Sequence, residues 1–156
     1  IAAVNGHALA GGFEVVMLCD LIVSIETARF GIPEVKRGLF AAGGGVRLPA
    51  RIPLAVAMEM GLTGDPIDAA RAKELGLINQ VVPASELREA ALALAARITV
   101  NGPLGVQATK QLMLDELGDG NPALLGQLQR SVFSSEDAKE GPRAFAEKRA
   151  PNWQGK

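Results

Sequence analysis

The stretch IAAVNGHALAGGFEVVMLCDLIVSIETARFGIPEVKRGL, residues 1–39, decides the class of fold. Two aliphatic runs within it, residues 1–4 and 21–25, are typical of short buried strands. Between them, residues 11–19 begin with two glycines and are predicted to form a short buried helix. Strand, glycine turn, helix and strand in this order predict an α/β layer.

The pattern continues to Pro83 and then changes. Further elements are expected as a strand and turn over 29–38, a helical pattern after the glycines of 41–52, helices over 54–64 and 68–76, and a strand over 77–82. Beyond Pro83 we expect a helix over 86–98 that is capped by Ser85. Two further helices are expected to begin at Pro103 and at Pro122. Residues 136–149 are expected to form two short helical pieces joined at Gly141-Pro142. We therefore predict an α/β part, residues 1–83, and a helical part, residues 84–156.

Composition limits the classes of function. The chain has 156 residues and a net charge of −1, with no basic block of the kind that nucleic acids attract. One cysteine and one histidine argue against a metal site and a disulfide, and they suit the reducing cytoplasm. No uncharged apolar run is long enough to span a membrane. The first residues read as the middle of a strand and not as a signal peptide, so we expect a longer protein to precede them.

Glu14 is the first candidate for chemistry, because it is the one carboxylate in an apolar run. An ionised glutamate is rarely fully buried, since removing it from water costs on the order of several kcal/mol. It is expected either to pair structurally with an arginine or a backbone amide, or to take part in a reaction. Gly11 and Gly12 precede it, and they allow a ligand to approach backbone N–H groups that favour negative charge.

Glu34 is the second candidate. Pro33 fixes its own φ and restricts Ile32, which would hold the following side chain in place. An exposed glutamate in a turn is the simpler interpretation. The helix, returning strand and turn after Glu14 would nevertheless bring Glu34 back beside it. Two carboxylates that face one cavity can divide the acid and base roles of a reaction.

Other residues carry weaker signals. The run Gly43–Gly45 is compatible with phosphate binding, but it lacks the residues that follow in a P-loop, so a tight turn or a helix start is favoured. His7 is interpreted as structural, and His7, Cys19 and Ser24 show no spacing typical of a nucleophilic triad. A sugar site with paired carboxylates is disfavoured, because the chain has one Trp and no Tyr.

Taken together, these motifs resemble the enoyl-CoA hydratase/isomerase (crotonase) superfamily. Residues 1–39 resemble its central signature, and LTGDPIDAARAKELGLINQVVP (62–83) resembles the segment that follows. SEDAKEGPRAFAEKRAPNWQGK (135–156) resembles its C-terminal tail, particularly that of carnitinyl-CoA dehydratase-like members. The resemblance implies the later part of a crotonase-like spiral of strand–strand–helix (ββα) turns, without its N-terminal half, followed by a helical oligomerisation region.

The resemblance also implies catalytic residues. Gly11 matches the glycine whose N–H is one of two oxyanion donors, the other belonging to the family's N-terminal half. Glu14 and Glu34 match the two catalytic glutamates of the hydratases.

Four further residues are implied in substrate binding. Gly12 and Phe13 adjoin the catalytic motif, and Phe13, with the stretch VKRGLFAAGGG (35–45), departs from the commonest hydratase wording near the expected acyl pocket. Phe145 and Lys148 match tail positions that reach a neighbouring subunit's coenzyme A in some members.

The expected function is hydration of a trans-2-enoyl-CoA, or the reverse dehydration, in fatty acid metabolism. The alternatives are an enoyl-CoA isomerase, a carnitinyl-CoA dehydratase, and a non-catalytic acyl-CoA-binding or assembly fragment. No cofactor is expected, because coenzyme A is part of the substrate. The expected assembly is a homotrimer or a dimer of trimers.

Overall fold

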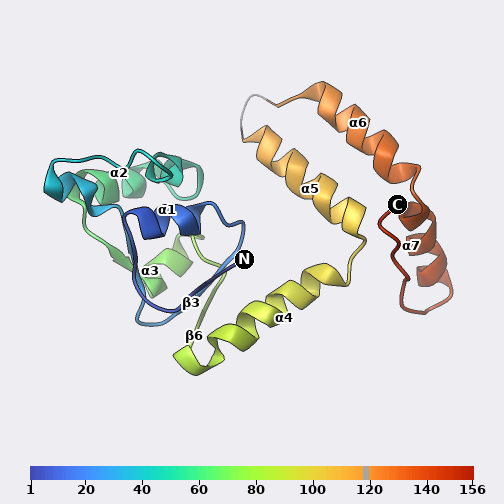
Figure 1. Cartoon of the computed structure of the whole chain (residues 1–156), viewed down its shortest axis with the longest axis horizontal. Helices are drawn as coiled ribbons and strands as arrows, with labels where there is room; N and C mark the ends of the chain where they lie inside the picture. The colour runs from blue at the N-terminus through green and yellow to red at the C-terminus, as the bar shows by residue number, and fades with distance from the viewer. Residues whose placement is uncertain (118–119) are drawn as a thin grey trace. The chain divides into compact units, whose positions relative to one another are not determined.

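The structure of the protein is a computed structural model, and it describes residues 1–117 and 120–156 (Figure 1). The chain forms two compact units, residues 1–94 and residues 95–156, and each is described by itself. Within the described ranges, no helix combines the length and the apolar character needed to cross a membrane.

The first unit alternates short strands with short helices. Its elements in chain order are β1 (Ala2–Val4), β2 (Ala8–Leu9), α1 (Gly11–Met17), β3 (Ile22–Ile25), β4 (Arg29–Gly31), the 3-10 helices η1 (Pro33–Arg37) and η2 (Gly45–Ala50), α2 (Leu54–Thr63), β5 (Ile67–Asp68), α3 (Ala69–Glu74), β6 (Gln80–Val82) and the 3-10 turn η3 (Ala84–Glu86). Helix α4 (Leu87–Thr99) begins in this unit and ends in the second.

The strands form two small sheets, and successive strand pairs place one strand in each sheet. β1, β3 and β6 form a parallel sheet in that order, with Ala3 opposite Val23 and Ser24 opposite Val81. In the other sheet β2 pairs with β4 in parallel, and β5 pairs with β4 in the antiparallel direction. This arrangement agrees with the α/β layer predicted from the first 39 residues and with the ββα organisation that the resemblance implies.

The core of the first unit lies around β3 and α1. All four residues of β3 are buried, as expected for the central strand of a parallel sheet. Phe13 of α1 and Phe30 of β4 are fully buried, and their rings meet edge to face. The other large hydrophobic side chains with almost no exposed surface are Ile22, Val23, Leu48, Met60, Leu77 and Ile78.

The ends of α2 and α3 follow local rules. Helix α2 ends at Gly64, whose φ of 70° is left-handed, and Gly76 adopts a φ of 76° after α3. Asp68 caps α3 by accepting the N–H of Arg71 at 2.8 Å. The predicted helices over 54–64 and 68–76 are thereby confirmed.

The start of α4 differs from the prediction. Ser85, expected as the cap, lies inside η3, and the cap position of that turn is Pro83. The N–H of Glu86 donates to the carbonyl of Pro83 at 2.9 Å. Because a 3-10 turn leads directly into α4, the capping role predicted for Ser85 is wrong.

The boundary of the compact units lies within α4. Helical structure alone follows β6, but the units divide after Leu94. Leu87 is buried in the core of the first unit, and Ala90, Ala91 and Leu94 pack against that core. The first turns of α4 therefore belong to the α/β unit by packing.

The second unit consists of the end of α4, α5 (Pro103–Glu116), α6 (Pro122–Phe133) and α7 (Glu136–Ala146). Helices α5 and α6 both begin with proline, as predicted, because the first helical residue needs no N–H partner. Asn121 caps α6 by accepting the N–H of Ala123 at 3.0 Å.

Helix α7 is continuous, so the predicted break at Gly141-Pro142 is wrong. Pro142 lies inside the helix and removes one backbone donor. Ser135 caps the start by accepting the N–H of Ala138 at 3.1 Å. A Cβ at Gly141 would lie 3.3 Å from Cη2 of Trp153, so the indole packs on the turn that precedes the proline. This contact supports the helix where the local sequence indicates an interruption.

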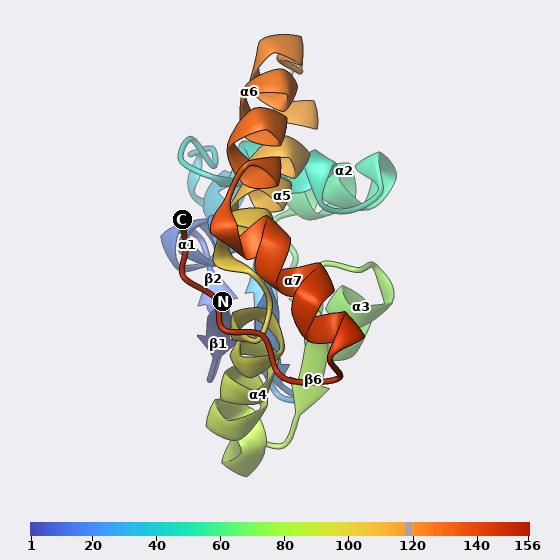
Figure 2. The ribbon, with the colours of Figure 1, turned by 90° about the vertical axis from the view of Figure 1, so that its right-hand side faces the viewer.

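The C-terminal segment, residues 149–156, returns along α7 (Figures 1 and 2). Arg149 binds both carboxylate oxygens of Glu140, with Nη1–Oε1 at 2.6 Å and Nη2–Oε2 at 3.0 Å. Closer to the helix start, buried Asp137 accepts the N–H groups of Gln154 at 2.6 Å and Gly155 at 3.0 Å. The segment is thus held at two levels of the helix.

Trp153 holds the same segment from its other side. Its indole N–H donates to the carbonyl of Val100 at 2.9 Å, and its ring packs between Gly102 and Gly141. The carbonyl of Lys156 accepts the N–H of Glu136 at 2.8 Å. The end of the described chain therefore lies beside the first residues of α7.

Candidate active site

Glu14 lies in the first turn of α1, as the sequence predicts. The residue before the helix, Ala10, has a φ of 50° and a ψ of −131°, which is a backbone conformation that favours glycine. The N–H of Ala10 donates to the carbonyl of Gly31 at 3.0 Å, and the carbonyl of Ala10 accepts the N–H of Glu14 at 3.0 Å. These bonds fix the start of α1 against β4 and offset the strain.

Gly11 and Gly12 form the exposed start of the same helix. A helix start leaves its first N–H groups without helical partners. Among the described residues, neither N–H has an acceptor outside the helix. A Cβ at either position would meet nothing within 4 Å, so the backbone here is open to a ligand.

The glycine run Gly43–Gly45 binds the side chain of Glu14. Oε1 accepts three backbone N–H groups, from Gly43 at 2.9 Å, from Gly44 at 2.8 Å and from Gly45 at 3.2 Å. The bonds from Gly44 and Gly45, and less strongly that from Gly43, hold the pKa of Glu14 below its ordinary value, although partial burial acts in the opposite direction. Glu14 is therefore stabilised as a carboxylate.

The sequence indicates a backbone amide as one possible partner of Glu14, but it does not identify the glycine run as the source of that amide. Sequence reasoning weighed this run as a phosphate cradle and favoured a tight turn or a helix start, and the run does lead into η2. The anion that it binds is a side chain of the same chain. Three consecutive glycines before a helix, together with one isolated carboxylate in an apolar helix, are the signal that could have identified it.

Glu34 lies in the first turn of η1, directly after Pro33. Its Oε2 is buried and has no hydrogen-bond partner among the described residues. A buried carboxylate oxygen without a partner is unusual in a folded protein and requires an explanation. The interpretation of Glu34 as an exposed turn residue is therefore wrong, because its residue surface is half-buried and this oxygen is covered.

The segment between η1 and η2 connects the surroundings of the two glutamates. A Cβ at Gly45 would lie 3.1 Å from Cγ2 of Ile32 and 3.8 Å from Oε1 of Glu14. Ile32 is the residue before η1, on which Glu34 lies. Glu14 and the element that carries Glu34 thus border the same glycine. A shared water between the two carboxylates stays a prediction.

The four residues predicted to bind substrate lie in different settings. Gly12 is exposed beside Gly11, whereas Phe13 is fully buried against Phe30 and contributes to the core. In the second unit, Phe145 is 87% exposed, and Lys148 is exposed with a left-handed φ of 53°. Their contacts with a substrate stay predictions.

The weaker candidates remain separate from this arrangement. His7 is exposed, and the hydroxyl of buried Ser24 donates to the carbonyl of Ile25 at 3.1 Å. Cys19 is partly exposed at the end of α1. Among the described residues, no group of three or more histidine, cysteine or acidic side chains is arranged to hold a metal ion.

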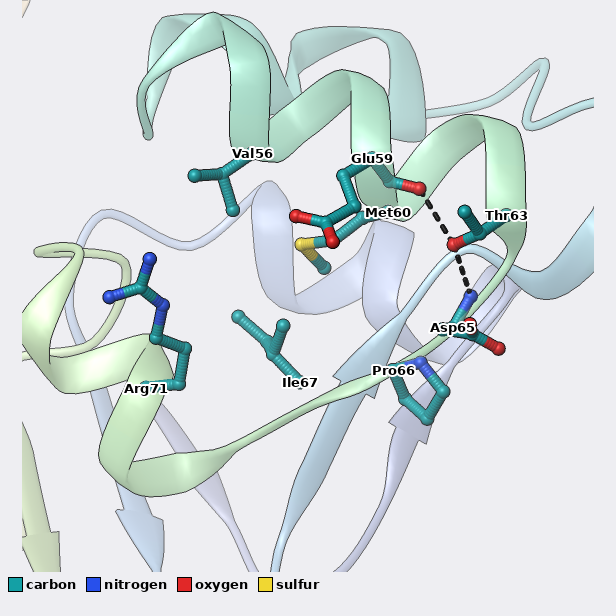
Figure 3. Close-up of a pocket in the computed structure, with 8 residues that line it drawn as sticks. All are labelled: Val56, Glu59, Met60, Thr63, Asp65, Pro66, Ile67 and Arg71. Carbon is teal, nitrogen blue, oxygen red and sulfur yellow. Dashed lines mark hydrogen bonds between the residues drawn. The ribbon is translucent and has the colours of Figure 1, made fainter.

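A separate cavity of about 270 Å³ lies between α2, β5 and α3 (Figure 3). Val56, Glu59 and Met60 of α2 lie over Ile67 and Arg71. Neither candidate glutamate lines it. Sites for drug-sized ligands are generally about 300–1,000 Å³, and a coenzyme A thioester is larger still. We therefore do not assign the acyl-CoA site to this cavity.

Comparison with known proteins gives a consistent result. The family model described as enoyl-CoA hydratase/isomerase matches residues 1–156. Enoyl-CoA hydratase EchA19 of Mycobacterium tuberculosis is 49% identical over 160 residues, covering 100% of this chain and 60% of the relative. Carnitinyl-CoA dehydratase of Salmonella typhi is 43% identical over 164 residues, covering 100% of this chain and 63% of the relative. The chain spans about three-fifths of these relatives' length.

Solved structures agree with the fold. A probable enoyl-CoA hydratase/isomerase from Mycobacterium abscessus matches with a TM-score of 0.93 and 53% identity, covering 99% of this chain and 63% of that one. Enoyl-CoA hydratase from Mycobacterium tuberculosis matches with a TM-score of 0.90 and 51% identity, covering 97% and 62% respectively. The predicted crotonase-like α/β fold is confirmed.

Proposed function

The chain belongs to the enoyl-CoA hydratase/isomerase family, and we propose that it performs hydratase chemistry on a trans-2-enoyl-CoA. Water is added across the double bond conjugated to the thioester, or removed from it in the reverse direction. The proposal extends to a role in fatty acid metabolism, where such thioesters are intermediates. It needs no cofactor, because the reaction exchanges only water and protons.

The observation that carries the proposal is the buried, unpartnered Oε2 of Glu34. A structural carboxylate would be expected to have a partner there. A carboxylate that binds water or exchanges a proton with substrate needs an oxygen free of protein partners. The first catalytic candidate, Glu14, lies across the same glycine segment and is held as a carboxylate.

In the proposed reaction, Glu14 accepts a proton from water as the water oxygen bonds to Cβ of the substrate. The electron pair of the double bond moves toward the thioester, which becomes an enolate. Glu34, carrying a proton, delivers it to Cα, and the enolate collapses to the saturated thioester. One proton then returns from Glu14 to Glu34 through solvent, which restores the starting state. Because both carboxylates can hold the water, these roles are partly shared.

The N–H of Gly11 would stabilise the enolate by donating to the thioester oxygen. Its exposure and its lack of a partner outside the helix support this role. One oxyanion donor typically contributes about 2.7–4 kcal/mol to lowering the barrier. In the family pattern a second donor comes from another segment of the enzyme.

Two other family reactions compete with this proposal. An enoyl-CoA isomerase moves a proton without adding water, so it does not require Glu14 to activate one. A carnitinyl-CoA dehydratase uses the same acid and base roles on a substrate that carries a quaternary ammonium group. The resemblance of residues 135–156 to the tail of that enzyme class supports keeping it as an alternative.

The assembly and the coenzyme A contacts belong to the same proposal. Exposed apolar side chains on α5 and α6, including Met113, Leu114, Leu125 and Phe133, support self-association, and the proposed assembly is a homotrimer or a dimer of trimers. In such an assembly, Phe145 and Lys148 would reach the coenzyme A of a neighbouring subunit, where the Lys148 ammonium could pair with a phosphate.

The test is hydration of crotonyl-CoA, which is monitored as the loss of absorbance of the conjugated enoyl thioester. We expect turnover that falls by roughly 10²–10⁴-fold in Glu14→Gln and in Glu34→Gln. Isomerisation of a 3-enoyl-CoA that survives in Glu14→Gln would instead favour the isomerase. Preference for crotonobetainyl-CoA would favour the dehydratase. Binding of crotonyl-CoA without turnover would favour the non-catalytic fragment.

A further inference from the structure

The three amides of Gly43–Gly45 converge on a single oxygen atom. Oε1 of Glu14 receives all three N–H bonds, at distances between 2.8 and 3.2 Å. Oε2 receives no hydrogen bond among the described residues. A glutamate that only capped the start of η2 would be free to share these donors between its two oxygens. The observed arrangement instead distinguishes the two oxygens of one carboxylate.

The space around the carboxylate explains why glycine occupies these positions. A Cβ at Gly43 would lie 2.4 Å from Oε2 of Glu14, and one at Gly44 would lie 3.1 Å from Cβ of Glu14. A Cβ at Gly45 would lie 2.4 Å from Cβ of Ala41. None of the three has a positive φ, so the backbone itself does not require glycine. The requirement comes from the close approach of the Glu14 side chain and the neighbouring loop.

We propose that the amides of Gly43–Gly45 are positioning groups that fix Glu14 through Oε1 and leave Oε2 as the oxygen that receives the proton of water. The role of that water rests on the proposed hydratase function. The glycine amides do not touch substrate in this proposal. They act through Glu14, by setting its direction and the oxygen that it presents.

The electrostatic setting agrees with this role. The lowered pKa of Glu14 is caused mainly by the bonds from Gly44 and Gly45. Of the two elements that pack most closely on α1, β2 carries no charged residue and η2 carries Arg47. Arg51, just after η2, donates to the carbonyls of Met17, the last residue of α1, and of Cys19, which follows the helix. The amide donors are therefore the groups whose removal should change the titration of Glu14.

The proposal is tested by a carboxyl ¹³C NMR titration of Glu14 in the wild-type chain and in Gly43→Ala. Gly43 is exposed and its backbone accepts alanine, but the added methyl group would collide with Oε2. We expect Glu14 to titrate below an ordinary glutamate in the wild type and closer to the ordinary value in Gly43→Ala. Gly6→Ala is the matched control, because a Cβ at Gly6 meets nothing within 4 Å.

A second readout, the backbone amide signals of Gly43–Gly45, tests the proposal even if Gly43→Ala folds poorly. In the wild type, the amide signals of Gly43–Gly45 should shift with the same midpoint as the Glu14 carboxyl. Glu14→Gln should abolish that pH-dependent shift, because it removes the titrating carboxyl group and leaves the three glycines unchanged. The positioning role would be overturned if Glu14 titrated in the wild type at the ordinary value for a glutamate. It would also be overturned if the amide signals did not shift with the titration midpoint of Glu14.

Turnover then separates this inference from the proposed function. If the wild-type chain hydrates crotonyl-CoA, Gly43→Ala should move the acidic limb of the kcat/KM profile to higher pH, as Glu14 becomes protonated more easily. If Gly43→Ala alters the titration of Glu14 but leaves the acidic limb of the kcat/KM profile unmoved, the positioning of Glu14 is not linked to the reaction. If the chain binds crotonyl-CoA without turning it over, the hydratase proposal fails, while the two titrations still decide whether Gly43–Gly45 position Glu14.

Discussion

The rings of Phe13 and Phe30 pack edge to face, with centroids 5.9 Å apart and planes inclined by 61°. Phe13 immediately precedes Glu14, and Phe30 lies on the strand that leads to η1 and Glu34. This buried contact therefore ties α1, which carries Glu14, to the strand that leads into the element carrying Glu34. Aromatic pairs of this geometry contribute about 0.5–1.5 kcal/mol beyond the burial of their area.

Replacing Phe30 should accordingly destabilise the α/β unit. We expect Phe30→Ala to lower the free energy of unfolding by about 3–5 kcal/mol, because it leaves a cavity and removes the ring contact. Urea denaturation followed by circular dichroism measures the change. Phe40→Ala is the matched control, since Phe40 is 76% exposed, and its effect should stay within about 0.5 kcal/mol. Equal effects of both variants would contradict the packing described here.

The strained backbone at Ala10 gives a prediction of opposite sign. Ala10→Gly should raise the free energy of unfolding by about 1 kcal/mol, because relief of about 1–3 kcal/mol of strain exceeds the entropic cost of glycine. Ala93→Gly, at an exposed position within α4, should lower it by a similar amount, as glycine does inside helices. Thermal unfolding of the two variants compares them directly. A loss of stability in both would show that Ala10 is not strained.

The pair Glu140–Arg149 makes the C-terminal segment sensitive to acid. The Arg149 guanidinium, the Asn152 N–H and the positive charges nearby lower the pKa of Glu140 to about 2. A carboxylate with a lowered pKa stabilises the folded state above its unfolded pKa of about 4.5 and loses that contribution as pH falls toward 2. We therefore expect the segment to detach between these values. Trp153, the single tryptophan of the chain, reports this as a red shift of its fluorescence.

The same fluorescence tests the ion pair at neutral pH. Glu140→Gln should expose Trp153 and weaken the acid transition, because glutamine cannot form the charged bidentate pair with Arg149. Glu136→Gln is the matched control on the same helix, where the pair with Lys139 is exposed. An acid transition that is unchanged in Glu140→Gln would assign it to another group.

The proposed assembly depends on the apolar surface of the second unit. Leu125→Lys should shift the mass measured by sedimentation equilibrium toward the monomer, because a buried lysine in an interface lacks a partner. Gln127→Lys places the same charge on α6 two residues from Leu125, at an exposed polar position on a different face of the helix, and should leave the mass unchanged. A wild-type chain that sediments as a monomer would refute the assembly.

Local sequence signals predicted most of the elements, because short buried strands and glycine- or proline-bounded helices are determined by neighbouring residues. They failed at α7, where the packing of Trp153 against Gly141 comes from residues distant in sequence. They also failed at Ser85, where the chain continues from one turn into a helix without a side-chain cap. In both places a tertiary arrangement outweighed the local preference.

The sequence predicted the side chains of the candidate site, but it did not identify which backbone amides bind Glu14. Glu14 and Glu34 are conspicuous because charge is rare in apolar runs and in proline turns. An amide donor has no such signature, since every residue but proline carries one. The glycine run indicated anion binding, but only the fold brings Gly44 to Glu14.

The course of residues 149–156 has a practical consequence for labelling. Because the carbonyl of Lys156 lies at the first N–H groups of α7, a dye or an affinity tag joined there would emerge beside Ser135. Phe145 lies at the opposite end of that helix, and Lys148 follows just after it. A fluorophore attached at Lys156 would therefore leave those two side chains accessible for testing the proposed contact with coenzyme A.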